Sequence, residues 1–124
     1  MIGLVLECYL EFVKLELPLA RGNFSSIYKS VRDCAVSLHV NGRSRPEHIL
    51  RAADLAAILY FKEVKCLQRS AVVARLLRRR GFPAELVIGI QHVPFRAHAW
   101  VEMNGSVLND KIYVSQMYSV IERC

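Results

Sequence analysis

The feature that most constrains this chain is a change in the spacing of its apolar residues at Pro83. Before Pro83, apolar residues recur every three or four positions, which is the spacing of one face of an α-helix. After it, from Ala84 to Gln91, apolar residues stand at every second position, as in a strand. Helices followed by strands predict an α+β fold.

The helical part of the sequence predicts four segments. They run from the start to about Leu17, from Ser26 to Val40, from the capping box Ser44-Arg45-Pro46-Glu47 to about Phe61, and from Cys66 to Arg80. We expect Pro18 to end the first helix, because proline has no N–H to donate. The apolar stripe of this first helix leaves two alternatives open, packing against the rest of the chain or docking a partner protein.

The last third of the sequence predicts an antiparallel sheet that packs on the helix beginning at Cys66. A second strand runs from about Ala97 to Met103, and Asn104-Gly105 then favours a tight type I′ turn, whose central residues both need positive φ. The predicted return strand is Ser106 to Asn109, continued by a short strand from Ile112 to Val114.

Composition supports one domain over residues 1–124, because 53% of the residues are apolar and 23% are charged. The first apolar run stops at Glu7, far short of the ~20 residues that span a membrane. The early acidic residues are also unlike a secretory signal. We therefore expect a cytoplasmic protein that does not insert into membranes.

The four cysteines, Cys8, Cys34, Cys66 and Cys124, are widely separated and form no C-x-x-C pair. We expect neither a disulfide framework nor a zinc site. The net charge is +6, and part of it comes from the run Arg78 to Arg80 at a helix end. A solvated last turn is favoured over a nucleic-acid contact, because no aromatic residues interleave with the arginines.

Three residues could form a catalytic set. Cys66 stands at a predicted helix start, where unpaired amides and the helix dipole favour an anion. His98 lies in a strand whose alternation sends His98, Trp100 and Glu102 to one face, which we expect to be polar and unlike a core. Continuing the hairpin register would pair residue 98 with residue 111 and bring Asp110 beside His98. Thiol, imidazole and carboxylate are the parts of a nucleophile, base and orienter.

Each residue also has a structural explanation. Cysteine is among the most buried residue types, and Cys8 and Cys34 fit that role on the apolar sides of helices. A strand histidine can be a satisfied structural residue, and an aspartate after a strand is common turn chemistry. The three residues together are more informative than any one of them.

The order and spacing of several segments resemble the transglutaminase-like leader peptidases of lasso-peptide biosynthesis. The resemblance covers residues 45–124 and rests on Cys66-Leu67-Gln68-Arg69-Ser70, on Leu76 to Ala84, on His98-Ala99-Trp100-Val101-Glu102, on Asn104-Gly105 and on Asn109-Asp110. It implies a variable helical region over residues 1–43 and a transglutaminase-like, papain-like catalytic core over residues 44–124.

The resemblance implies a stand-alone cysteine protease that removes the leader from a lasso-peptide precursor. Cys66 would be the nucleophile, His98 the base and then the acid, and Asp110 the orienter. The implied partners are the precursor peptide, a separate leader-recognition protein and the lasso cyclase, with no nucleic acid, and no metal or cofactor is implied. Two alternatives stay open, another acyl-transfer enzyme of the same fold and a non-catalytic peptide-binding module.

Overall fold

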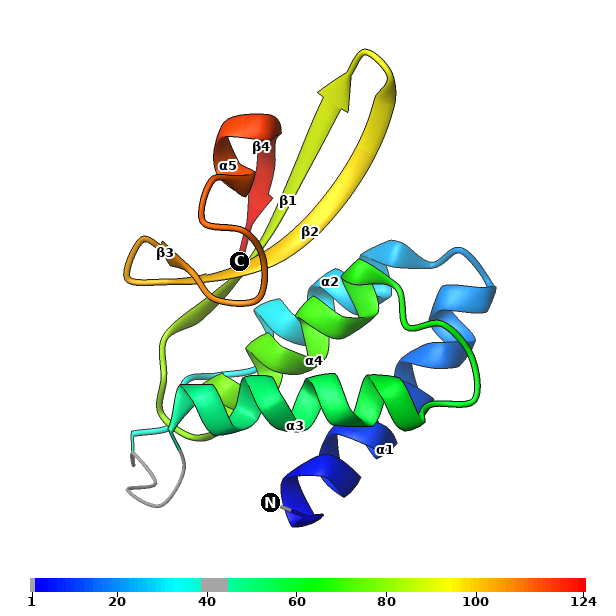
Figure 1. Cartoon of the computed structure of the whole chain (residues 1–124), viewed down its shortest axis with the longest axis vertical. Helices are drawn as coiled ribbons and strands as arrows, with labels where there is room; N and C mark the ends of the chain where they lie inside the picture. The colour runs from blue at the N-terminus through cyan, green and yellow to red at the C-terminus, as the bar shows by residue number, and fades with distance from the viewer. Residues whose placement is uncertain (1, 39–44) are drawn as a thin grey trace.

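The computed structural model describes residues 2–38 and 45–124. In chain order they form α1 (Ile2–Ala20), α2 (Phe24–Arg32), α3 (Pro46–Leu59), α4 (Cys66–Arg79), β1 (Ala84–His92), β2 (Phe95–Met103), β3 (Ser106–Val107), α5 (Val114–Met117) and β4 (Ser119–Arg123). The predicted α+β class is confirmed. In Figure 1 helices α1 to α4 gather at one side of the molecule, and the β1–β2 hairpin extends beyond them. None of the described helices combines the length and the apolar character needed to cross a bilayer.

The described strands form one antiparallel sheet in the order β3-β2-β1-β4, and α4 packs on β1 and β2. Buried side chains of α4 meet Leu86 of β1 and Val101 of β2 in the main core. Phe12 of α1 and Ile27 of α2 are fully buried in the same core. The predicted packing of the first helix is thus confirmed, while its docking of a partner stays a prediction. The predicted boundary between residues 43 and 44 lies outside the described residues.

The first helix does not end at Pro18 as predicted, but continues to Ala20. Proline removes only one intrahelical hydrogen bond, and here that loss falls in the last turn. The helix ends instead where Gly22 adopts a φ of 69°, a left-handed conformation that favours glycine. The Pro18 carbonyl then accepts a hydrogen bond from the Asn23 N–H at 2.8 Å.

The second helix is shorter than the predicted range from Ser26 to Val40, because α2 ends at Arg32. Two carbonyls near this end are taken by the guanidinium of Arg78, at 2.7 Å for Val31 and 3.1 Å for Cys34. Because Arg78 binds these carbonyls, the helix does not continue past Arg32, and Cys34 lies after the end of α2. The last two positions of the predicted range lie outside the described residues.

The predicted solvated turn at the end of α4 is only partly solvated, because Arg79 is exposed whereas Arg78 and Arg80 are partly buried. Arg79 donates to Glu11 at 2.7 Å and Arg80 to Glu7 at 2.6 Å, both on α1, while Arg78 binds backbone carbonyls. These contacts were not predicted, because the sequence pattern does not show that α1 and α2 lie alongside this end of the helix. The arginines hold the helices together.

The strands agree with the prediction up to the hairpin and differ beyond it. Asn104 and Gly105 have φ values of 53° and 81°, as a type I′ turn requires. The return strand stops after two residues instead of reaching Asn109, and the predicted strand from Ile112 to Val114 is a turn leading into α5. β4, which pairs with the outer side of β1, was not predicted.

Gly89 is a glycine that the sheet requires. It lies opposite His98, and a Cβ at this position would be 2.8 Å from both the Trp100 ring and the Tyr118 Cβ. We predict that Gly89→Ala lowers the free energy of unfolding by roughly 1–3 kcal/mol, measured by urea denaturation, because two packed side chains would have to shift. Gly3→Ala is the control, since no atom lies within 4 Å of its Cβ position. Equal stability of both variants would contradict this.

Candidate active site

Cys66 is the first residue of α4, and its side chain is exposed. Lys65 precedes it in an extended conformation, and no side chain caps this helix end. The first amide N–H groups of a helix have no intrahelical partner, so they favour negative charge at this point. The first turn also contains no acidic residue. The position suits a nucleophilic sulfur.

His98 and Asp110 form a pair beside this helix end. The Nε2 atom of His98 is hydrogen-bonded to Asp110 Oδ2. The two side chains are sheltered, with exposed fractions of 25% and 22%. Because Asp110 occupies Nε2, it favours the tautomer that carries the proton there. Nδ1, which has no hydrogen-bond partner among the described residues, is then the nitrogen able to accept a proton.

Asp110 reaches His98 by a different route from the predicted strand register. Backbone pairing between β2 and the segment after β3 ends at one hydrogen bond. In it, the Leu108 N–H donates to the Val101 carbonyl at 2.9 Å. At the next position the side chain of Asn109 replaces the backbone and accepts from the Val101 N–H at 2.7 Å. The chain leaves the sheet at this point, and residue 111 does not pair with His98.

Two residues that the sequence reasoning did not assign hold this arrangement together, Ser70 and Asn109. Asn109 Nδ2 donates to Ser70 Oγ at 3.0 Å, and Ser70 Oγ donates to the Ala99 carbonyl at 3.1 Å. Ser70 is only 1% exposed and lies four residues after Cys66, on the same face of α4. A polar residue one turn after the cysteine was the available signal.

Aromatic rings shelter His98 on its face of the sheet. Its ring is stacked at 5.3 Å from Tyr118 and at 6.0 Å from Trp100, measured between centroids. The prediction that this face is polar and unlike a core was wrong. Trp100 is fully buried with Val87 and Val114, because the C-terminal segment covers the face. Figure 1 shows this segment, with α5 and β4, lying against the hairpin.

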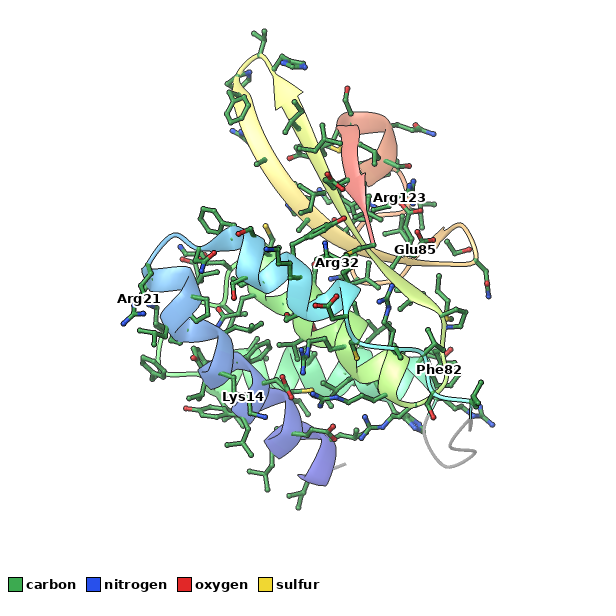
Figure 2. The ribbon with its side chains drawn as sticks, turned by 180° about the vertical axis from the view of Figure 1, so that it is seen from behind. Lys14, Arg21, Arg32, Phe82, Glu85 and Arg123 are labelled. Carbon is green, nitrogen blue, oxygen red and sulfur yellow. The ribbon has the colours of Figure 1, made fainter. Side chains whose placement is uncertain are left out.

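Glu102 is buried on the same face and is held as a carboxylate. It accepts from Trp100 Nε1 at 2.7 Å and from Arg123 Nη1 at 2.9 Å. Burial raises the pKa of this carboxyl, but the hydrogen bonds from Trp100 and Arg123 outweigh it and hold the pKa below its ordinary value. Figure 2, which views the molecule from behind, labels Arg123 at the end of β4.

The three predicted residues line one cavity. Cys66, His98 and Asp110 border a space of about 280 Å³, with Ser70 and Asn109 also in its wall. A second cavity, of about 490 Å³, also borders Cys66 and His98 and is walled mostly by apolar residues. The structure thus brings the thiol, the imidazole and the carboxylate to one cleft, which is the set that acyl transfer through a thioester uses.

The other cysteines lie elsewhere, and all four in the described residues are free. Cys8 is fully buried, and burial, with a smaller effect of Glu7, raises the pKa of its thiol to about 12. Cys34 and Cys124 are partly buried, and their sulfur atoms lie 3.8 and 4.0 Å from backbone carbonyls. Among the described residues, no group of three potential ligands is placed to hold a metal ion.

Fold and site define an α+β protein with a cysteine, a histidine and an aspartate in one cleft. The sequence model of the transglutaminase-like superfamily matches residues 10–123, so the chain belongs to that superfamily. Among curated proteins, the chain is similar to the microcin J25-processing protein McjB of Escherichia coli, with 38% identity over 79 residues. That match covers 60% of this chain and 38% of McjB, so the chain spans well under half of that relative. No solved structure matches the chain.

The Ser70 network leads to a prediction about stability. Replacing Ser70 by alanine removes the donor to the Ala99 carbonyl and leaves Asn109 Nδ2 without its acceptor. We predict that Ser70→Ala lowers the free energy of unfolding by about 1–3 kcal/mol, the cost of unsatisfied buried polar groups. The matched control is Ser115→Ala on α5, which is exposed. Equal effects in chemical denaturation would show that the network does not stabilise the fold.

The carboxylate of Glu102 leads to a prediction about pH. Its folded-state pKa is below the ordinary value of 4.5, so its stabilising effect is complete above that pH and is lost as the pH falls. We expect Glu102→Gln to reduce the loss of unfolding free energy between about pH 6 and about pH 3, relative to wild type. Glu47→Gln, at an exposed position, should keep the wild-type dependence. Identical pH profiles for wild type and Glu102→Gln would refute this role.

Proposed function

We propose that this protein is a cysteine peptidase that cleaves the leader from a lasso-peptide precursor in the cytoplasm. The observation that carries the proposal is the cleft shared by Cys66, His98 and Asp110, with His98 Nε2 bound to Asp110. Membership of the transglutaminase-like superfamily and the similarity to a microcin J25-processing protein support the substrate class.

In the proposed first step, His98 Nδ1 takes the proton of the Cys66 thiol, and the sulfur bonds to the scissile carbonyl carbon. Asp110 keeps the His98 ring oriented and stabilises its positive charge. The carbon–nitrogen bond then breaks, and the His98 imidazolium gives its proton to the leaving amine. The product of this half-reaction is a thioester on Cys66.

In the second step a water molecule loses a proton to His98 Nδ1 and attacks the thioester carbonyl. The carbon–sulfur bond breaks, the leader leaves with a new carboxyl group, and His98 returns its proton to the departing sulfur, which regenerates the Cys66 thiol. Negative charge on the carbonyl oxygen develops next to the start of α4, where the Cys66 backbone N–H is a suitable donor. Such a donor contributes roughly 2.7–4 kcal/mol in well-studied acyl-transfer enzymes.

The proposal includes a partner. The resemblance that the sequence shows implies a separate leader-recognition protein, which would raise the local concentration of the precursor at the cleft. The cyclase that uses the exposed amino group is a further candidate partner. We therefore expect cleavage by the isolated chain to be slow and to accelerate when the recognition protein is added.

The decisive experiment uses a synthetic lasso-precursor fragment that spans the junction of leader and core. We predict that wild type, with its leader-recognition partner, cuts the fragment at one bond, and that Cys66→Ala lowers kcat by at least about 10⁴-fold. Mass spectrometry of the products provides the measurement. Cys124→Ala is the matched control, because this thiol lies outside the cleft and should leave cleavage unchanged.

Other outcomes of this assay separate the alternatives. A product whose mass shows a new amide in place of the carboxyl group would identify an acyl transferase. A fragment that binds but stays uncut by wild type would favour a non-catalytic peptide-binding module. Cleavage that persists in Cys66→Ala would reject the assigned nucleophile.

A further inference from the structure

One side of β2 is without a strand partner along most of its length. β3 pairs only with Glu102 and Met103, at one end of β2. From Phe95 to Trp100, the described residues provide no neighbouring strand on that side. A free strand edge presents N–H and C=O groups that can pair with another extended chain.

The hydrogen bonds at the end of this edge show which backbone groups face it. The Val101 carbonyl and N–H both point to this side, because they bond to Leu108 and Asn109. Backbone groups in an antiparallel strand alternate in direction, so those of Ala99 and Ala97 point the same way. The Ala99 carbonyl is already taken by Ser70. The Ala99 N–H and both backbone groups of Ala97 have no partner among the described residues.

This edge borders the candidate active site. Ala97 and Ala99 line the cavity of about 490 Å³ that Cys66 and His98 also border. The other walls of that cavity include Leu19, Phe24, Leu67 and Ile88. Ala97 is exposed and Ala99 is only 4% exposed, so the edge is most accessible at Ala97 and closes toward Ala99.

We propose that the substrate peptide binds as a short additional strand along the edge of β2 from Phe95 to Ala99. Ser70 already binds the Ala99 carbonyl, and Asn109 already binds the Val101 N–H, so the added strand ends at this point. Ser70 lies one helical turn after Cys66 on α4. About two or three backbone hydrogen bonds would form, and alternate side chains of the peptide would point into the apolar cavity. That the bound peptide is the substrate rests on the proposed peptidase function.

A peptide is the expected occupant, because the free edge is continuous with the cleft that holds Cys66 and His98. A second copy of the chain pairing through the same edge is the alternative occupant. That arrangement would cover the edge, and it predicts a dimer in solution that the substrate peptide dissociates. Sedimentation measurements on the wild-type chain with and without the peptide distinguish the two, and such a dimer would overturn the proposal.

The test is a scan of backbone N-methylation in the lasso-precursor fragment. Each residue on the leader side of the cleaved bond is replaced in turn by its N-methyl form, which removes one donor and keeps the side chain. We expect kcat/KM to fall about tenfold or more at the two alternate positions whose N–H groups face the carbonyls of Ala97 and Phe95, and to change less than about twofold at the positions beside them. Losses without this alternation would overturn the proposal.

The same peptides are also measured for binding to the Cys66→Ala variant by fluorescence anisotropy. The affinities should show the same alternation, because removing the Cys66 thiol does not change the backbone N–H and C=O groups on the edge of β2. If wild type fails to cut the unmodified fragment but the affinities alternate, the peptidase function fails while the strand-like binding stands. If cleavage occurs and neither series alternates, the binding mode alone fails. If the fragment neither binds nor is cut, both are rejected.

Discussion

The hydrogen bonds between Ser70, Asn109 and β2 are the interaction on which the candidate site depends. Apolar packing of α4 on the sheet is not directional, so it does not by itself fix the helix along the strands. Ser70 does so by bonding to the Ala99 carbonyl, and Asn109 connects the same hydroxyl to the Val101 N–H. Because Cys66 lies on that helix and Asp110 follows Asn109, one buried network positions both sides of the cleft.

A second polar cluster holds the far end of α4. Arg78 bonds to the Val31 carbonyl of α2 and to the Ala84 carbonyl at the start of β1. Arg79 bonds to Glu11, which is 3% exposed. Burial raises the pKa of Glu11, but the hydrogen bond from Arg79 and the nearby charge of Arg75 outweigh it and hold the pKa below its ordinary value. Helix α4, which carries the candidate nucleophile, is therefore fixed toward both ends by directional bonds.

Local patterns predicted the parts of this structure that local interactions determine. The change of spacing at Pro83 located α4 and β1, and Asn104-Gly105 located the hairpin. The early end of α2 was missed because it depends on Arg78, more than forty residues away in the sequence. β4 was missed because its residues are all exposed and show no alternation, so only its pairing with β1 defines it. Asp110 was expected near His98, although Asn109 and not the strand register places it there.

The environment of His98 explains why a small domain can present a histidine–aspartate pair at a sheet edge. Gly89 on the neighbouring strand leaves room for Trp100 and Tyr118, which then stack beside the imidazole. These rings exclude water from one side of the pair, and charge interactions are stronger where water is excluded. The opposite side borders Cys66 and the apolar cavity. Access to the pair is thus directed toward the Cys66 thiol and the open edge of β2. Under the proposed function, an extended peptide would be held along that edge while its carbonyl carbon meets the sulfur.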